Sequence, residues 1–199
     1  KGYKLKEDLP FIKFKFPINY VFYYDNYDRN FVWSLQCWFH LLSYIQYFEK
    51  TKDKTILTLI IDEVNNWNTY TKSIDTRKAK KHLIWDDMAT GIRAQILSYL
   101  NQYCNNIDEL VKEHISFLID ENNWRQHNHC IFMAFGLILL SKKKTHFNFG
   151  HKKLKELINS QYIQGMHCEN SPEYHIKVYE ILKNFYKKNK SLFQENFEL

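Results

Sequence analysis

The feature that most constrains the fold is a helical spacing of apolar residues, which recurs from residue 28 almost to the end of the chain. Apolar side chains that return every three to four residues lie on one face of an α-helix. Only 5 Gly and 3 Pro occur in 199 residues, so few positions favour a break. The sequence therefore predicts an all-α fold of antiparallel helix hairpins. The expected helices cover residues 28–50, 56–67, 85–100, 107–119, 129–140, 154–158 and 176–192.

The first part of the chain lacks this spacing. Aromatic residues alternate imperfectly with Lys around Phe11, Phe14 and Phe16, and Pro10 and Pro17 disfavour a helix. We expect an extended arm over residues 1–27. The remaining residues, 28–199, are expected to form one domain, because 45% of the chain is hydrophobic and can supply one core.

The charge of the chain favours an anionic partner. The formal net charge is +6, but Lys residues are scattered and cluster only at 78–81, 142–144 and 187–190. This distribution is typical of a solvated basic surface rather than a nucleic-acid stripe, and an acidic polysaccharide suits it equally well.

The apolar runs are too short to cross a membrane, which takes about 20 residues. The most apolar run, residues 131–140, predicts a buried helix. The four Cys lack a CxxC spacing and are expected to be free thiols. The chain opens without a signal peptide, and we expect it to be part of a longer protein.

The segment His167–His175 packs two His, two Glu, a Cys, a Ser and a Tyr into nine residues, and such groups are costly to bury. Ser171 and Pro172 suit the cap and first turn of a following helix, whose N-terminus favours an anion. Tyr174 is the candidate for proton transfer. Its reference pKa of about 10 requires cationic neighbours, such as His175 or an Arg. The alternative is a capped surface helix.

Two further segments carry polar groups beside apolar helices. In Trp85–Arg93, Arg93 lies on the apolar side, so it lines a cleft or pairs internally with Asp86 or Asp87. Both interpretations remain open.

The second segment is Asn122–His129, which precedes the most apolar helix. Asn128 or His129 falls at the N-cap, and an ordinary Asn cap is the simpler interpretation. The neighbouring Trp124, Arg125 and His127 exceed what a cap needs and favour a pocket for a carboxylate or oxyanion.

A metal site is a rival interpretation of these segments. No pair of the candidate ligands has a recognised zinc spacing. The candidates are His127, His129, Cys130, His167, Cys168 and His175.

Taken together, four stretches resemble the heparinase II/III-like polysaccharide lyases. They occur in the order of that family and span about residues 28–185. The fourth, which matches an H-x-E-x-S-P-x-Y-H pattern, is the most specific. The stretches are Asp28–Leu35, Trp85–Arg93, Asn122–Gly136 and His167–His175.

The resemblance implies an α/α toroid, followed in the family by a β-sandwich, and cleavage of uronic-acid polysaccharides by β-elimination without a cofactor. By that resemblance, Tyr174 is the base and acid, and Asn128 or His129 neutralises the uronate carboxylate. A periplasmic or cell-envelope location in a bacterium would fit this activity. The residues left to bind the sugar chain are Trp85, Arg93, Trp124, His127, Glu169 and His175.

The chain also departs from the family. The β-sandwich is absent and the toroid is short, so we expect a fragment or a diverged member. A uronate C5-epimerase, or a helical module that only binds an acidic glycan or a partner protein, remains an alternative.

Overall fold

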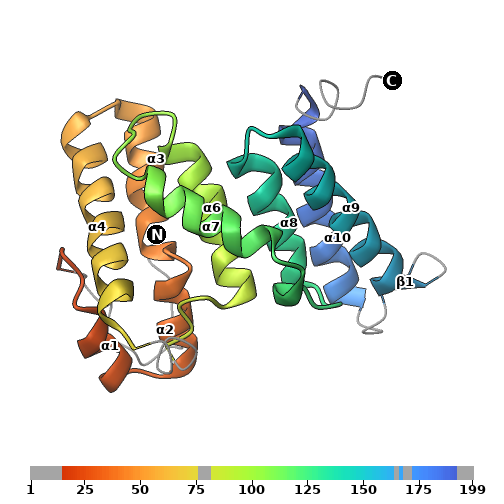
Figure 1. Ribbon diagram of the computed structural model, residues 1–199, viewed down its shortest axis with the longest axis horizontal. Helices are drawn as coiled ribbons and strands as arrows, with labels where there is room; N and C mark the ends of the chain where they lie inside the picture. Colours follow the sequence, from red (N-terminus) through yellow and green to blue (C-terminus); the bar gives the residue numbers. More distant parts are fainter. Residues whose placement is uncertain (1–14, 76–81, 164–165, 168–171, 192–199) are drawn as a thin grey trace. The chain divides into compact units, whose positions relative to one another are not determined.

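The computed structural model describes residues 15–75, 82–163, 166–167 and 172–191, which are almost entirely helical (Figure 1). Within these residues, the strands are one antiparallel pair, β1 (Tyr162–Ile163) with β2 (Met166–His167). The predicted all-α class is therefore confirmed. The chain divides into two compact units, Lys1–Ala89 and Thr90–Leu199. The single domain expected over 28–199 stays a prediction.

Unit 1 begins its helices at side chains that accept hydrogen bonds from the first turn. The carboxylate of Asp28 accepts from the backbone N–H of Asn30 and Phe31, and Asp53 accepts from Thr55, as expected of N-caps. Helices α3 and α4 pack against each other. The helices of unit 1 are α1 (Tyr20–Asn26), α2 (Arg29–Gln36), the 3-10 helix η1 (Phe39–Leu41), α3 (Leu42–Thr51) and α4 (Lys54–Ser73).

The predicted helix over 28–50 is interrupted at Trp38, which adopts a left-handed backbone conformation with φ 57°. A left-handed residue costs roughly 1–2 kcal/mol. The indole of Trp38 is fully buried and meets Trp67 edge to face, with ring centroids 5.2 Å apart. Burying a large aromatic side chain stabilises by about 1.5–3 kcal/mol, which offsets the backbone cost.

Helix α1 lies where an extended arm was predicted. The side chain of Asn19 accepts from the backbone N–H of Phe22 at 3.0 Å and starts the helix. Tyr20 is buried and stacks on Tyr70 with ring centroids 5.0 Å apart. Local capping and this contact decide the conformation of residues 19–26. The first part of the predicted arm, residues 1–14, lies outside the described residues.

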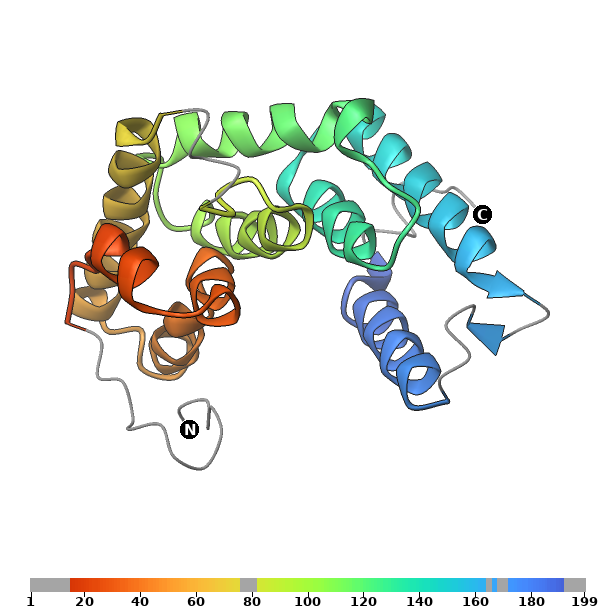
Figure 2. The same cartoon turned by 90° about the horizontal axis from the view of Figure 1, so that it is seen from below.

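Unit 2 is organised around α8, a helix that is buried along most of its length. It packs against α7 and α9 (Figure 2). Phe135 of α8 stacks on Phe185 of α10 with ring centroids 3.6 Å apart. The division between the units falls within α6. The remaining elements are α6 (Asp87–Leu100), α7 (Asp108–Ile119), the 3-10 helix η2 (Glu121–Asn123), α8 (His129–Leu140), α9 (Lys144–Gln161) and α10 (Pro172–Lys188).

Two glycines let α6 and α8 touch backbone to backbone. A Cβ added at Gly91 would lie 2.3 Å from the backbone carbon of Phe132. A Cβ added at Gly136 would lie 2.7 Å from the carbonyl oxygen of Gly91. Only glycine permits this approach, which fixes where α8 begins relative to α6.

Within the described residues, no helix combines the length and apolar character needed to span a membrane.

Candidate functional site

The segment that leads into α8 presents two imidazoles side by side. The rings of His127 and His129 meet edge to face with centroids 4.8 Å apart. His127 is half-buried and His129 is exposed. The backbone N–H of His129 points at Nδ1 of His127 at 3.3 Å. The two rings are therefore held close together at a surface that solvent reaches.

Asn128 is the N-cap residue of α8 by position, but its side chain makes no capping hydrogen bond. Its backbone is in the right-handed helical region, and its carbonyl accepts from Ile131 at 3.1 Å. Asn128 therefore does not cap α8 through its side chain, which was the simpler interpretation of this residue.

Trp124 anchors the same segment. Its indole N–H donates to the carbonyl of Leu118 at 3.0 Å, and its ring meets Phe149 edge to face at 5.8 Å. The ammonium of Lys153 lies 6.0 Å from the ring centroid, at the outer limit of a cation–π contact. Arg125 is exposed, and its backbone N–H donates to the buried Sγ of Cys130 at 3.4 Å. We call Trp124, Arg125, His127, Asn128 and His129 the α8 N-terminal surface.

Arg93, by contrast, is part of the core of unit 2 and is fully buried. Its Nε donates to Nε2 of His114 at 3.1 Å, and one terminal nitrogen donates to Oγ1 of Thr90 at 3.2 Å. A polymer cannot contact a side chain with 0% exposure, so Arg93 does not line a sugar groove in this conformation.

His114 is the partner of Arg93 that the sequence did not single out. Its Nδ1 lies 2.9 Å from the carbonyl of Leu110, so Nδ1 carries the proton and Nε2 accepts from Arg93. Burial and then the charge of Arg93 hold the pKa of His114 well below its ordinary value of 6.5. His114 is therefore neutral.

Trp85 belongs to unit 1. It is half-buried and meets Trp67 edge to face with centroids 6.4 Å apart. The neighbouring Asp86 accepts from the indole of Trp33 at 3.0 Å and from the backbone N–H of Ala89 at 3.1 Å. Asp86 therefore supports the start of α6.

The C-terminal segment is described only in part. Glu169 and the side chain of Tyr174 lie outside the described residues. His175 is half-buried in the first turn of α10. The convergence of Tyr174 with the α8 N-terminal surface therefore stays a prediction.

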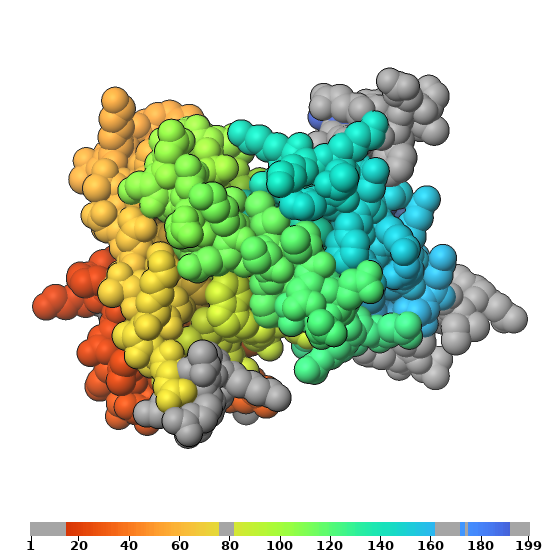
Figure 3. Space-filling view, viewed as in Figure 1, coloured from red at the N-terminus to blue at the C-terminus, as the bar shows by residue number. Residues whose placement is uncertain are grey.

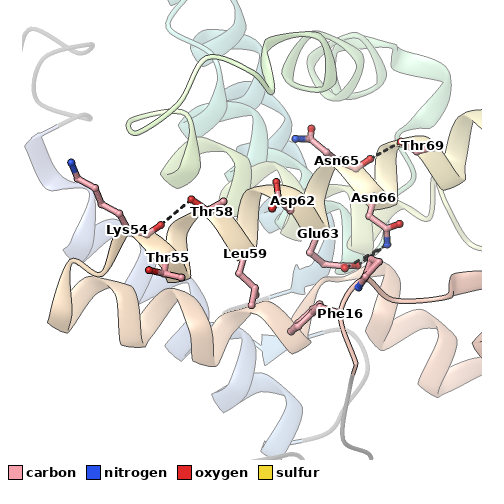
Figure 4. A pocket seen from close by; sticks show the side chains of 11 residues that line it. Phe16, Lys54, Thr55, Thr58, Leu59, Asp62, Glu63, Asn65, Asn66 and Thr69 are labelled. Carbon is pink, nitrogen blue, oxygen red and sulfur yellow. Dashed lines mark hydrogen bonds between the residues drawn. The ribbon is translucent and has the colours of Figure 1, made fainter.

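Unit 1 contains a pocket of about 960 Å³ along the outer side of α4 (Figure 4). The space-filling view shows α4 at the surface of this unit (Figure 3, orange to yellow). Phe16 and Pro17 form the wall across from the helix, and most of the other lining groups are hydroxyls, amides and carboxylates. The lining residues of α4 are Lys54, Thr55, Thr58, Leu59, Asp62, Glu63, Asn65, Asn66 and Thr69.

Glu63 lies at the inner edge of this α4 pocket and is 1% exposed. Its two carboxylate oxygens accept from the backbone N–H of Ile18 at 3.0 Å and from the hydroxyl of Tyr20 at 2.8 Å. Asn66 donates to the same carboxylate at 3.3 Å. Burial raises the pKa of Glu63, and these three hydrogen bonds partly oppose that shift. The sequence analysis did not identify this residue.

Comparison of the chain with protein-family models, with curated proteins and with solved structures gives no match. An assignment of function therefore depends on the residues and their geometry.

Proposed function

We propose that the chain is the helical domain of a heparinase II/III-like polysaccharide lyase, with its hairpins arranged as part of an α/α toroid. It would bind an acidic, uronate-containing polysaccharide at the α8 N-terminal surface. The observation that carries the proposal is the close pair of His127 and His129 beside Trp124, on a segment that solvent reaches.

These residue types suit a uronate unit of a sugar chain. An imidazole and an exposed Arg can donate charge-assisted hydrogen bonds to a carboxylate. A Trp face can cover the apolar face of a sugar ring. The formal net charge of +6 also favours a polyanion.

The proposed reaction is β-elimination. Asn128 or His129 offsets the uronate charge, so the C5 proton becomes more acidic. Deprotonated Tyr174 takes the C5 proton, the electron pair forms the C4–C5 double bond, and the C4–O bond breaks. The departing oxygen then takes the proton from Tyr174, which balances the step. His127, Trp124 and His175 would position the sugar chain, with Glu169 as a further support.

Binding is tested with a defined uronate oligosaccharide by calorimetry. We expect His127→Ala combined with His129→Ala to weaken binding about tenfold or more, since charge-assisted hydrogen bonds contribute about 1.5–3 kcal/mol each. His146→Ala is the matched control, because His146 bonds to Ser141 beyond the opposite end of α8. Equal affinities for all three proteins would contradict the site.

Turnover is tested by the ultraviolet absorbance of the unsaturated uronate product. We expect Tyr174→Phe to abolish the rise in absorbance while the circular dichroism spectrum stays unchanged. Full activity of this variant would exclude Tyr174 as the base. Oligosaccharide binding without any product would instead identify a binding module, and exchange of the C5 proton without elimination would identify an epimerase.

A further inference from the structure

The segment before α1 shows how α4 binds a non-helical stretch of chain. We call residues 15–19 the strap. Glu63 accepts the backbone N–H of Ile18 at 3.0 Å, and the amide of Asn66 donates to the carbonyl of Ile18 at 2.9 Å. The side chain of Ile18 is 3% exposed. An acid and an amide three residues apart on one helix thus satisfy both backbone polar groups of one residue outside the helix.

The same spacing occurs a second time on α4, one residue earlier. Asp62 and Asn65 are also an acid and an amide at positions i and i+3, so their side chains neighbour each other on the helix surface. Asp62 is exposed and Asn65 is half-buried, and both line the α4 pocket. Figure 4 shows them along one side of α4, with Glu63 turned toward Phe16.

The surroundings of this second pair can hold a further chain. Phe16 and Leu59 line the same pocket and lie on the side of α4 where Glu63 lies (Figure 4). Within the described part of the chain, no hydrogen bond or ion pair engages the side chains of Asp62 and Asn65. The charge of Asp62 favours a segment that carries a Lys or Arg.

We propose that Asp62 and Asn65 form a second peptide clamp, which binds a non-helical, basic segment of a partner protein in the α4 pocket. Asp62 accepts a backbone N–H of the partner, and Asn65 donates to the carbonyl of the same residue. The clamp bonds to backbone groups, so it selects a segment whose N–H and C=O are not already paired in a helix, and the pocket selects the side chains. This site lies in unit 1 and is independent of the proposed lyase activity.

The experiment measures the fluorescence anisotropy of a labelled heptapeptide, Lys-Phe-Pro-Ile-Asn-Tyr-Val, which copies the strap and the start of α1. We expect the wild-type protein to bind it. Asp62→Ala combined with Asn65→Ala should weaken binding at least about tenfold, because a hydrogen bond to a charged group contributes roughly 1.5–3 kcal/mol. A heptapeptide with an N-methylated Ile cannot donate to the carboxylate and should bind equally weakly.

Two controls separate the clamp from its alternatives. Gln46→Ala with Glu49→Ala removes an exposed amide and acid at the same spacing on α3, outside the pocket, and should leave affinity unchanged. Glu63→Gln should also retain binding, because Glu63 serves the strap.

Three results would overturn the proposal. The first is that wild-type protein fails to bind the peptide. The second is that affinity depends on Glu63 but not on Asp62, which would mean that the peptide only displaces the strap. The third is that binding of a neutral oligosaccharide, rather than binding of the peptide, depends on Asp62 and Asn65. Asp62→Asn preserves side-chain size, so weaker binding by this variant excludes a folding defect as the cause.

Discussion

Glu63 in unit 1 and Arg93 in unit 2 are both charged side chains with almost no exposed surface, and the two units satisfy them in opposite ways. Glu63 accepts hydrogen bonds from Ile18 and Tyr20, whereas Arg93 donates hydrogen bonds to His114 and Thr90. Burying a charge is costly unless hydrogen bonds replace its hydration. Each of these two charges therefore depends on the hydrogen bonds that replace its hydration.

The two networks differ in the distance along the chain that they span. Glu63 bonds to residues 43 and 45 positions earlier, so it ties the strap and α1 to α4. Arg93 bonds to His114, 21 positions later, and to Thr90 on its own helix. The first network fixes a peripheral segment, and the second lies inside a helix bundle. Substitution of Arg93 is therefore expected to destabilise the core of unit 2, and substitution of Glu63 to release the strap from α4.

The largest effect is expected from Arg93→Ala. It leaves the acceptor of His114 buried without its donor and creates a cavity, so the free energy of unfolding should fall by about 3–5 kcal/mol. Urea denaturation followed by circular dichroism measures this change. Arg125→Ala removes the same side chain from an exposed position and should change stability by about 0.5 kcal/mol or less. Similar losses for the two variants would mean that Arg93 is not a core residue.

A smaller effect, about 2–3 kcal/mol, is expected from Glu63→Ala, because the N–H of Ile18 and the hydroxyl of Tyr20 lose their acceptor. The variant should also increase hydrogen exchange at the amide of Ile18, since the strap is released. Asp62→Ala is the matched control, as it removes the adjacent, exposed acid. If exchange at Ile18 stays slow in Glu63→Ala, the strap does not depend on this carboxylate.

The helices that the sequence predicted best are those with the strongest apolar spacing. The expected helix over 129–140 matches α8, and that over 107–119 matches α7 within one residue. Only 154–158 of α9 was expected, because its first half carries few apolar residues and gains its helical conformation by packing on α8. The break at Trp38 could not be predicted, since it depends on Trp67, 29 positions later in the chain.

The polar residues show a similar limit. The apolar side of its helix marked Arg93 as unusual, but its bonds to His114 and Thr90 depend on how α6 and α7 pack. Glu63 was overlooked because it lies in a polar run, and its donors come from a segment more than forty residues away. The signal that could have found it is the repeated acid–amide spacing in Asp62-Glu63-Val64-Asn65-Asn66.

The smallest expected effect concerns pH: Glu63 and His114 should change the free energy of unfolding in opposite directions as the pH changes. Burial raises the pKa of Glu63 above 4.5, so the folded protein binds this proton more tightly than the unfolded chain. The contribution of this raised pKa to the free energy of unfolding is fully present below about pH 4.5. It is lost as the pH rises through the raised pKa. The pKa of His114 lies well below 6.5 in the folded protein. Its contribution is present above about pH 6.5 and is lost as the pH falls through the lowered pKa.

Two difference curves isolate these contributions. The free energy of unfolding is measured against pH for the wild type, for Glu63→Gln and for His114→Gln, and each variant is subtracted from the wild type. The wild-type advantage over Glu63→Gln should shrink as the pH rises above 4.5, by at most about 1.4 kcal/mol per pH unit. The advantage over His114→Gln should shrink as the pH falls below 6.5. Subtraction removes the effect of other titrating groups such as His40, which burial shifts to a pKa of about 3. Curves of the same slope would contradict this pair of shifts, because a group with a raised pKa and a group with a lowered pKa change the stability in opposite directions with pH.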